Sequence, residues 1–344
     1  MPRLPFKLAL VGATGEVGRA ALDAIDALDL PVSEVRAFAS ARSAGSTVEL
    51  RGDELRVAAL SAGAFRGCDV AVFCAGPEVA REWAPRAWAE GCAVVDDSPA
   101  FRMDADVPLV VPEVNAEAVA GFRARGLVAN PNATATALAV ALAPLHAVAG
   151  LERVVVSTYQ AVSGAGRSGV AELEREAREL LALREPAPAA RFRHRIAFNL
   201  IPHIGPVAAG GAAEEEAKIA RELRKVLALP GLGVSATAVR VPIFFGHSAA
   251  VNVTLREALS AEAARELLRK AAGVKVVDDP AQGIYPMPML AANEDAVLVG
   301  RVREDPSQPR GLDLFVVVEN TRKGAATNAL QIARLLAERH LGGA

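Results

Sequence analysis

The stretch that most constrains the fold is FKLALVGATGEVG, residues 6–18. Its apolar first half is typical of a buried strand, and Gly12, Gly15 and Gly18 follow before apolar residues recur at helical spacing. Glycine lets the backbone approach a pyrophosphate, and a helix N-terminus supplies N–H donors and the positive end of its dipole. A tight turn without a ligand is the alternative interpretation. The strand-turn-helix context favours a dinucleotide site.

Strands and helices continue to alternate up to about residue 150. Strands are predicted in SEVRAFAS, CDVAVFCAG, CAVVDDS and GLVANPN, and helices in PEVAREWAPRAWAEG and over residues 134–149. Parallel neighbours need a crossover connection, which is usually a helix. The order therefore predicts an α/β chain with a Rossmann-like, doubly wound parallel sheet.

The pattern changes in the second half of the chain. Longer, Val-rich strands are predicted in LERVVVSTYQAVSGAG, GVSATAVRVPIFFGHSAAVNVTL, DAVLVGRVRED and GLDLFVVVEN, with helices over roughly 168–184, 213–228 and 260–272 and a last helix in KGAATNALQIARLLAERHL. ALREPAPAARFRH is predicted to be an exposed loop. These elements predict a second, α+β domain on a mixed or antiparallel sheet. A chain of 344 residues suits two domains, which we expect at 1–132 plus 322–344 and at 133–321.

Composition argues against two classes of partner. The net charge is −2 with both signs dispersed, and no basic block is interleaved with aromatic residues, so we expect neither nucleic acid nor an anionic membrane surface to bind.

No apolar run is long enough to span a bilayer. The three cysteines, Cys68, Cys74 and Cys92, lack the spacing of a metal site. We therefore expect no metal, and reduced thiols in a cytoplasmic protein.

The end of the second predicted strand indicates which dinucleotide would bind. An NAD-binding unit places an acidic residue about 20 residues after the glycine turn, to hold the ribose hydroxyls. Here the sequence is ASARSAG, with Ser40, Arg42 and Ser43 and no acid. A guanidinium and two hydroxyls suit a 2′-phosphate, so NADP is predicted. A solvated loop arginine is the alternative interpretation.

Nine motifs occur in order along the chain: VGATGEVG, ASARSAG, SPAFRMDADVPLVVPEVN, ANPNATA, STYQAVSGAG, IAFNLIPHI, RVPIFFGHS, YPMPM and ENTRKGAATNALQIA. Together they resemble aspartate-semialdehyde dehydrogenase of the bacterial type, over essentially the whole chain. The resemblance implies NADPH-dependent reduction of β-aspartyl phosphate to aspartate β-semialdehyde, which feeds lysine, methionine and threonine synthesis. It also implies a homodimer, with a tetramer left open, whose second domain carries catalysis and dimerisation.

The same resemblance implies the catalytic residues. The family's active-site helix begins with a nucleophilic cysteine, and Ala133 stands at that position here. A thiolate at a helix N-terminus attacks the acyl phosphate, which a methyl group cannot do. His247, in FFGHS, matches the general acid/base, Gln160, in TYQAVSG, matches the residue that orients the acyl group, and Asn132 lies beside the missing thiol. The chain as written is therefore predicted to bind its ligands without turnover.

Charged residues of the resemblance would hold the substrate. Arg102 and Lys218 match the pair that grips the leaving phosphate, and Arg240 matches the clamp on the α-carboxylate. Glu215, three residues before Lys218 on one helix face, would meet the α-amino group. Each of these charges alone is more often a surface residue, and His247 alone could be a core histidine, but their joint occurrence in family order favours function. The other histidines are interpreted as structural or surface residues: His146, His194, His203 and His340.

Cofactor contacts are implied in both domains. The matching residues are Gly12, Thr14, Gly15, Glu16, Val17, Ser40, Arg42, Ser43, Ala75, Gly76, Ser163, Gly164 and Asn320. Two departures from the family pattern lie in the same sequence region. Asp97-Ser98-Pro99 replaces Asn-Ser-Ser and removes one backbone donor and one hydroxyl. The family's SAG motif is here Cys74-Ala75-Gly76, and we interpret Cys74 as a packing residue rather than a substitute nucleophile.

Three functions are compatible with these residues. The first is an aspartate-semialdehyde dehydrogenase whose cysteine has been replaced by design. The second is a natural non-catalytic paralogue with a binding or structural role, against which the retained Arg102, Gln160, Arg240 and His247 argue. The third is N-acetyl-glutamyl-phosphate reductase, whose nucleophile usually follows Pro-Gly rather than Pro-Asn. VPEVN also favours the aspartyl enzyme, so the third ranks well below the first.

Overall fold

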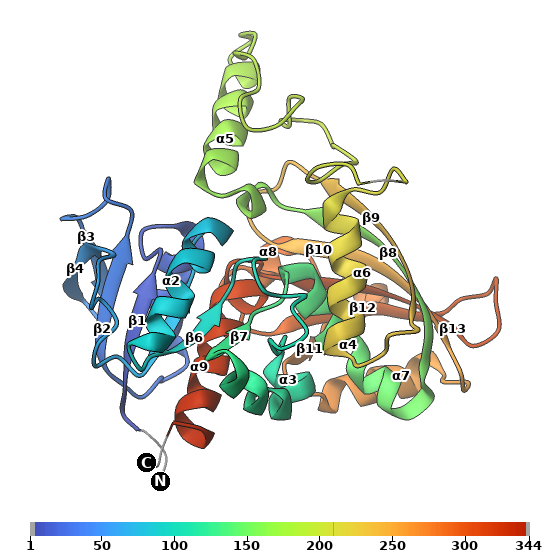
Figure 1. The fold of residues 1–344 in the computed structure, drawn as a ribbon. Coiled ribbons are helices and arrows are strands. Elements are labelled where there is room, and N and C mark those ends of the chain that lie inside the picture. Colours follow the sequence, from blue (N-terminus) through green and yellow to red (C-terminus); the bar gives the residue numbers. More distant parts are fainter. Residues whose placement is uncertain (1–3, 209, 342–344) are drawn as a thin grey trace. The chain divides into compact units, whose positions relative to one another are not determined.

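The structure is a computed structural model, and it describes residues 4–208 and 210–341. The chain divides into two compact units, residues 1–132 with 325–344 and residues 133–324. Figure 1 shows the elements of each, coloured from blue at the N-terminus to red at the C-terminus. Within the described ranges, no helix has both the length and the apolar composition needed to cross a membrane.

The first unit is built on a seven-stranded sheet with the order β3-β4-β2-β1-β5-β6-β7 (Figure 1). Its strands are β1 (Phe6–Val11), β2 (Val32–Ala39), β3 (Thr47–Leu50), β4 (Asp53–Ala59), β5 (Val70–Phe73), β6 (Ala93–Asp96) and β7 (Leu127–Ala129). Its helical elements are α1 (Glu16–Ala27), α2 (Pro77–Ala89), α3 (Pro112–Asn115), η1 (Ala116–Ala124) and α9 (Thr327–Arg339). All neighbouring strands are parallel except β3 and β4. The predicted doubly wound parallel sheet is confirmed.

The central strands of this sheet are continuous apolar runs because helices cover both faces. Every residue of β5 and β6 is buried. The apolar stripe of α1, which includes Leu22 and Ile25, joins a core that also holds Leu330 and Leu336 of α9. Helix α9 therefore completes the first unit, although it follows the second unit in the sequence.

The β3–β4 hairpin of the first unit was not among the predicted elements. The sequence TVELRGDELRVAA carries its signal, because polar and apolar residues alternate on both sides of Arg51-Gly52. Both turn residues have positive φ, 54° for Arg51 and 81° for Gly52, as a type I′ hairpin turn requires.

The second unit is built on a six-stranded sheet with the order β11-β12-β13-β10-β8-β9. Its strands are β8 (Leu151–Gln160), β9 (Gly233–Arg240), β10 (His247–Leu255), β11 (Val274–Val276), β12 (Val297–Glu304) and β13 (Gly311–Val318). Its helical elements are α4 (Ala133–Ala149), η2 (Val162–Ala165), α5 (Arg167–Leu181), α6 (Glu214–Val226), α7 (Ala261–Lys270), η3 (Pro280–Gln282) and α8 (Pro288–Ala291), and η4 (Arg322–Ala326) leads into α9. β8–β9 and β11–β12 are parallel and the other pairs antiparallel, so the predicted mixed sheet is confirmed.

One face of this second sheet is covered by helices. α4 contacts β8, β10, β12 and β13, α6 packs on β9, and α7 packs on β12 (Figure 1). α4 is buried on almost every side, which accounts for its nearly uniform apolar sequence. α5 and the segment that follows it extend away from the sheet of this unit (Figure 1).

Candidate active site

The glycine turn of the first unit lies at the point where the strand order of the sheet reverses. β1 has β2 on one side and β5 on the other, and this switch point is where doubly wound sheets bind ligands. Gly12 has φ +89°, and a Cβ built on it would lie 2.3 Å from the carbonyl oxygen of Cys74, just beyond β5. Only glycine fits this turn, so the backbones that follow β1 and β5 lie close together.

Helix α1 begins directly after this turn. Gly15 is its N-cap, and no side chain caps the first turn. A Cβ on Gly18 would lie 2.1 Å from the Gly12 carbonyl oxygen, so helix and turn are tightly packed. Thr14, Glu16 and Val17 complete the turn and first helical residues. Because glycines leave the N–H groups of the helix N-terminus uncovered, this turn suits the binding of a pyrophosphate.

The residues predicted to hold a 2′-phosphate form a turn at the end of β2. The backbone N–H groups of Ser43 and Ala44 both donate to the carbonyl oxygen of Ser40, at 2.8 and 3.1 Å. Arg42 in this turn is exposed to solvent. At the end of β5, Ala75 precedes Gly76, which is the N-cap of α2 and also lacks a side-chain cap.

Asp97-Ser98-Pro99 follows β6 and has a structural role of its own. The Ser98 backbone N–H and hydroxyl donate to the two carboxylate oxygens of Asp96, at 3.0 and 2.7 Å. Burial raises the pKa of Asp96 to about 6, against the lowering effect of these hydrogen bonds. Arg102 is buried and donates from Nη2 to the carbonyl oxygen of Asp97 at 2.6 Å.

Cys74 is the departure that could supply a second thiol. It packs against the core of the first unit. Burial, helped by the charges of Asp97 and Asp96, raises the pKa of its thiol well above the usual value. A thiol held in its protonated form is a poor nucleophile, in agreement with its interpretation as a packing residue.

Position 133 lies at the first residue of α4 in the second unit. Ala133 is half-buried, and no acidic side chain occupies the first turn of the helix. Gly324 packs against it closely enough that a Cβ there would lie 2.7 Å from the Ala133 Cβ. No carboxylate within the first turn offsets the helix dipole, and a helix N-terminus of this kind favours a thiolate.

Gln160, the last residue of β8, connects the start of α4 to α6. Its side chain is 1% exposed. The amide Nε2 donates to Oγ1 of Thr134 at 2.8 Å and to Oε1 of Glu215 at 3.1 Å. Both hydrogen bonds come from the amide nitrogen and fix the orientation of the amide, so the side-chain carbonyl points away from these two partners.

His247, the first residue of β10, has a defined tautomer. Its Nδ1 accepts a hydrogen bond from the Ala161 backbone N–H at 3.2 Å, which places the imidazole proton on Nε2. Burial and the nearby charge of Arg240 lower the pKa of His247 well below 6.5. Nε2 lies 3.1 Å from a Cβ built on Gly164, so glycine keeps the space beside the imidazole open.

Arg240, the last residue of β9, is a buried cation. Its Nη1 donates to the carbonyl oxygen of Ala161 at 2.5 Å. Burial lowers its pKa to about 10, while the carboxylate of Glu215 opposes that shift and the charge of Arg191 adds to it. The guanidinium therefore stays charged at neutral pH, with its remaining N–H groups available to an anion.

Helix α6 presents Glu215 and Lys218 from its first two turns. Lys218 Nζ lies 3.1 Å from Oε1 of Glu214, one turn earlier on the helix. The carboxylate of Glu216 accepts the N–H groups of Ala213 and Ala238, at 2.7 and 3.0 Å, which fixes the start of α6 to β9. Glu215 and Lys218 are thus held beside the end of β9, where Arg240 lies.

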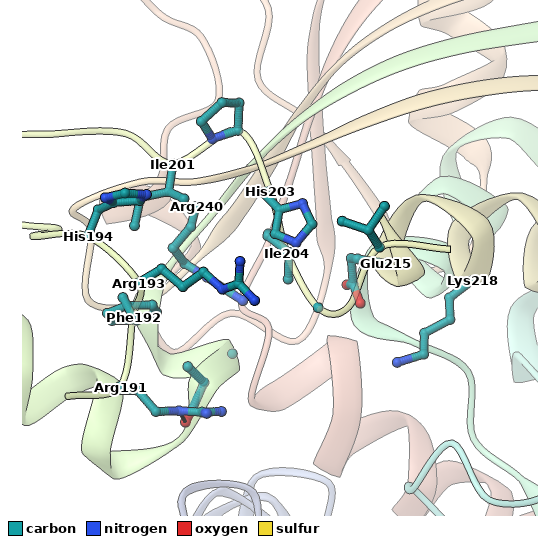
Figure 2. A pocket seen from close by; sticks show the side chains of 15 residues that line it. Arg191, Phe192, Arg193, His194, Ile201, His203, Ile204, Glu215, Lys218 and Arg240 are labelled. Atoms are coloured by element: carbon teal, nitrogen blue, oxygen red, sulfur yellow. Dashed lines mark hydrogen bonds between the residues drawn. The ribbon is translucent and has the colours of Figure 1, made fainter. Parts of the chain in front are cut away.

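Glu215, Lys218 and Arg240 line a cavity of about 720 Å³ in the second unit (Figure 2). Arg191, Arg193, Lys218 and Arg240 give it positive charge, and Glu215 is the one carboxylate among the described residues on its wall. Its remaining lining residues are Gly164, Ala165, Phe192, His194, Ile201, Pro202, His203, Ile204, Gly205 and Val207. The cavity therefore suits a small ligand with more negative than positive charge.

Two of the predicted cofactor residues meet at η2. The hydroxyl of Ser163 and the side-chain amide of Asn320 are hydrogen-bonded at 3.0 to 3.1 Å. Asn320 Oδ1 also accepts the backbone N–H of Gly246 at 3.0 Å. Ser163, Gly164 and Asn320 thus share one polar cluster beside His247.

Comparison with known proteins identifies the family. The family described as "Semialdehyde dehydrogenase, NAD binding domain" matches residues 7–122, and "Semialdehyde dehydrogenase, dimerisation domain" matches residues 142–323. The aspartate-semialdehyde dehydrogenase of Aquifex aeolicus is 46% identical over 337 residues, which cover 98% of this chain and 99% of that protein. This chain belongs to the aspartate-semialdehyde dehydrogenase family.

Solved structures of aspartate-semialdehyde dehydrogenases have the same fold. Enzyme II of Vibrio cholerae, in a complex with ASA, superposes with a TM-score of 0.95 at 41% identity, over 97% of this chain and 99% of that one. The Candida albicans enzyme, solved with NADP, superposes with a TM-score of 0.73 at 26% identity, over 98% and 99% of the two chains. Members of this family are oxidoreductases of amino-acid biosynthesis.

The predicted site residues of this chain fall into two groups. Ala133, Gln160, Glu215, Lys218, Arg240, His247, Ser163, Gly164 and Asn320 lie in the second unit, where the contacts above connect most of them. Arg102 and Asn132 lie in the first unit with the glycine turn and the β2 turn.

The structure also places residues at the site that the sequence did not indicate. Thr134 holds Gln160, and the segment containing Arg191 and Arg193 lines the cavity. His194 and His203, expected to be structural or surface residues, lie on the same wall. The arginines of the Pro/Ala-rich loop gave no signal in the sequence, because only the folded chain brings that loop to the cavity.

Proposed function

We propose that this chain carries the binding sites of an NADP-dependent aspartate-semialdehyde dehydrogenase and that Ala133 prevents its turnover. The observation that carries the proposal is the double hydrogen bond of Gln160, to Thr134 and to Glu215. It connects the first turn of α4, where the nucleophile belongs, to a cavity whose charges suit an amino-acid phosphate.

The substrate would be β-aspartyl phosphate in one direction and aspartate β-semialdehyde with phosphate in the other. Arg240 would hold the α-carboxylate, and Glu215 would hold the α-ammonium group. Lys218 would bind the phosphate. Arg102 and Asn132 are assigned the roles that the resemblance implies, in binding the phosphate and in adjoining the nucleophile.

The chemistry requires a thiol at position 133. A cysteine there would attack the acyl carbon as thiolate and expel phosphate to form a thioester. Gln160 would orient the acyl group. His247, whose Nδ1 accepts the Ala161 N–H, would carry its proton on Nε2 and donate it as a hydrogen bond to the oxyanion that develops on the acyl carbon. Its lowered pKa keeps the imidazole neutral at pH 7.

The cofactor would be NADP, which supplies or accepts the hydride when it is bound. The tight turn at Gly12 and the open N-terminus of α1 support pyrophosphate binding. The turn at the end of β2 supports binding of a 2′-phosphate, because it has the exposed guanidinium of Arg42, the hydroxyls of Ser40 and Ser43, and no acidic side chain.

The decisive experiment is the substitution Ala133→Cys. NADP reduction is followed with aspartate β-semialdehyde and phosphate, beside the parent chain and an Ala133→Ser variant. The cysteine variant is expected to gain about 10⁴-fold or more in rate, because a covalent nucleophile contributes at least that much. The serine variant is the matched control, since it restores size without a reactive thiol.

Other outcomes separate the alternatives. An inactive Ala133→Cys protein that still binds NADP would favour the non-catalytic paralogue. Activity with N-acetyl-glutamate semialdehyde in place of aspartate semialdehyde would favour the reductase of that substrate. Absence of NADP binding in all forms would contradict the assignment of the first unit.

We further propose that the chain forms a homodimer through the open face of the second sheet. Ser157 and Tyr159 of β8 and Ala250 of β10 point away from the helices, and Tyr159 stacks on Phe315 with ring centroids 6.3 Å apart. Tyr159 is exposed in the single chain. Tyr159→Asp is expected to yield monomers in sedimentation analysis. A tetramer and a cytoplasmic location stay predictions.

A further inference from the structure

The four-residue turn η2 holds two guanidinium groups. Arg240 donates from Nη1 to the Ala161 carbonyl oxygen at 2.5 Å, at the start of the turn. Arg191 donates from Nε to the Ala165 carbonyl oxygen at 3.1 Å, at its end. Both arginines line the 720 Å³ cavity (Figure 2). One short segment therefore fixes two cations on the wall of one cavity.

The segment that carries Arg191 is held firmly, although it has no regular secondary structure. The carboxylate of Glu172 on α5 accepts the backbone N–H groups of Ala190, Arg191 and Phe192, at 2.8, 2.7 and 3.1 Å. One turn later, the buried Glu176 accepts two more backbone N–H groups, from residues 196 and 197. Hydrogen bonds to a carboxylate are among the stronger ones in proteins. The position of Arg191 is thus determined by α5.

The placing of the two arginines leaves positive charge unbalanced. The charge of Arg191 lowers the pKa of Arg240, so the two groups interact. Among the described residues that line the cavity, Glu215 is the one carboxylate, against Arg191, Arg193, Lys218 and Arg240, and Lys218 also pairs with Glu214 outside the wall. The Nη1 group of Arg240 donates to the Ala161 carbonyl oxygen, so fewer of its N–H groups remain for the two oxygens of a bound carboxylate. A second guanidinium would complete the coordination of that carboxylate.

We propose that Arg191 is a specificity-determining residue that binds the α-carboxylate of the substrate together with Arg240, and that Glu172 is the residue that positions it. The identity of the substrate rests on the proposed function. The arrangement selects molecules with a free carboxylate next to the carbon that bears the amino group. An ester or amide at that position would leave two cations without a counter-charge.

The test uses equilibrium binding of aspartate β-semialdehyde to the parent chain, where Ala133 prevents a covalent adduct, measured by calorimetry. Arg191→Ala is expected to weaken binding about tenfold. The matched control is Arg195→Ala, which removes the same side chain four residues further along the same segment, from a position outside the cavity wall. Its affinity is expected to stay within about twofold of the parent.

Kinetics in the Ala133→Cys background provide a second readout. Arg191→Ala should raise KM for aspartate β-semialdehyde about tenfold and leave KM for NADP and kcat within about twofold, because the carboxylate lies away from the reacting carbon. Glu172→Gln should change KM in the same direction, and adding it to Arg191→Ala should have little further effect, since both act through one contact. Arg191→Lys should restore part of the affinity.

The outcomes distinguish this inference from the function on which it rests. A parent chain that binds aspartate β-semialdehyde, with Arg191→Ala binding it equally well, overturns the role of Arg191 alone. Equal losses in Arg191→Ala and Arg195→Ala also overturn it, because they would reflect general surface charge. A folded parent chain that does not bind aspartate β-semialdehyde overturns the proposed function, and with it the ligand named here.

Discussion

The turn after β1 and the turn after β8 each shape a candidate binding site, but they do so with different parts of the chain. The first turn uses backbone, and Gly12 matters because it has no side chain. At the second, η2 fixes the side chains of Arg191, Arg240 and His247 through backbone groups of residues 161 and 165. A backbone site depends on the fold itself, whereas a side-chain site can lose its function through one substitution that the fold tolerates.

The largest expected effect comes from adding a side chain to the backbone site. Gly12→Ala places a Cβ 2.3 Å from a carbonyl oxygen at φ +89°, and should cost about 3 kcal/mol or more of unfolding free energy and abolish NADP binding. Gly45→Ala is the matched control, because Gly45 has φ +87° and no neighbour within 4 Å of its Cβ. It should cost about 1 kcal/mol. Equal losses, measured by chemical denaturation, would contradict the close approach.

The pH dependence of stability should differ between the two units. Asp96, in the first unit, has a pKa raised to about 6, so its neutral form stabilises the fold at low pH. This contribution to the free energy of unfolding, about 3 kcal/mol, is lost as pH rises from about 4 to 6. His247, in the second, has a lowered pKa, so only the unfolded chain takes up its proton, and stability is lost as pH falls below about 6.5. The slope for His247 is up to about 1.4 kcal/mol per pH unit.

Two variants separate these opposing slopes. Denaturation of the parent, Asp96→Asn and His247→Asn is compared between pH 5 and 6. Relative to the parent, His247→Asn should lose more stability as pH rises, because the contribution of Asp96 is no longer offset. Asp96→Asn should lose more stability as pH falls. Parallel curves for all three proteins would show that neither group is perturbed.

A smaller effect is expected at the β2 turn, where the proposed binding of the 2′-phosphate uses side chains of the first unit. Arg42→Ala should raise KM for NADP about tenfold in the Ala133→Cys background, because one cation contact to the 2′-phosphate is lost. KM for NAD serves as the internal control and should stay within about twofold, since NAD lacks that phosphate. An equal change for both cofactors would assign Arg42 to the shared part of the dinucleotide.

The difference between the two regions also explains what the sequence could predict. The glycine turn and the alternating strands of the first unit follow local rules, and the sheet is the doubly wound parallel sheet that was predicted. The β3–β4 hairpin was not predicted, because its strands are short and its turn residues, Arg51-Gly52, are not among the pairs most common in hairpin turns.

The site in the second unit needed the family pattern, because its residues come from α4, β8, α6, β9 and β10. No spacing rule predicts that Gln160 joins Thr134 to Glu215, a contact that spans 26 residues on one side and 55 on the other. Arg191 escaped for the same reason, since a carboxylate 19 residues away holds its backbone. Contacts between distant residues are a property of the fold rather than of any local motif.

The smallest expected effect is on the stability of the Ala133→Cys variant. The substitution keeps the Cβ that packs against Gly324 and adds one sulfur at a half-buried position, so the unfolding free energy should change by less than about 1 kcal/mol. Chemical denaturation of parent and variant measures it.

A thiolate favoured by the start of α4 would give the variant higher thiol reactivity than the buried Cys92, whose pKa is raised by burial. Restored activity without a change in stability would show that the second site lost its chemistry while its fold stayed intact. A loss of several kcal/mol would mean instead that the fold has adapted to alanine.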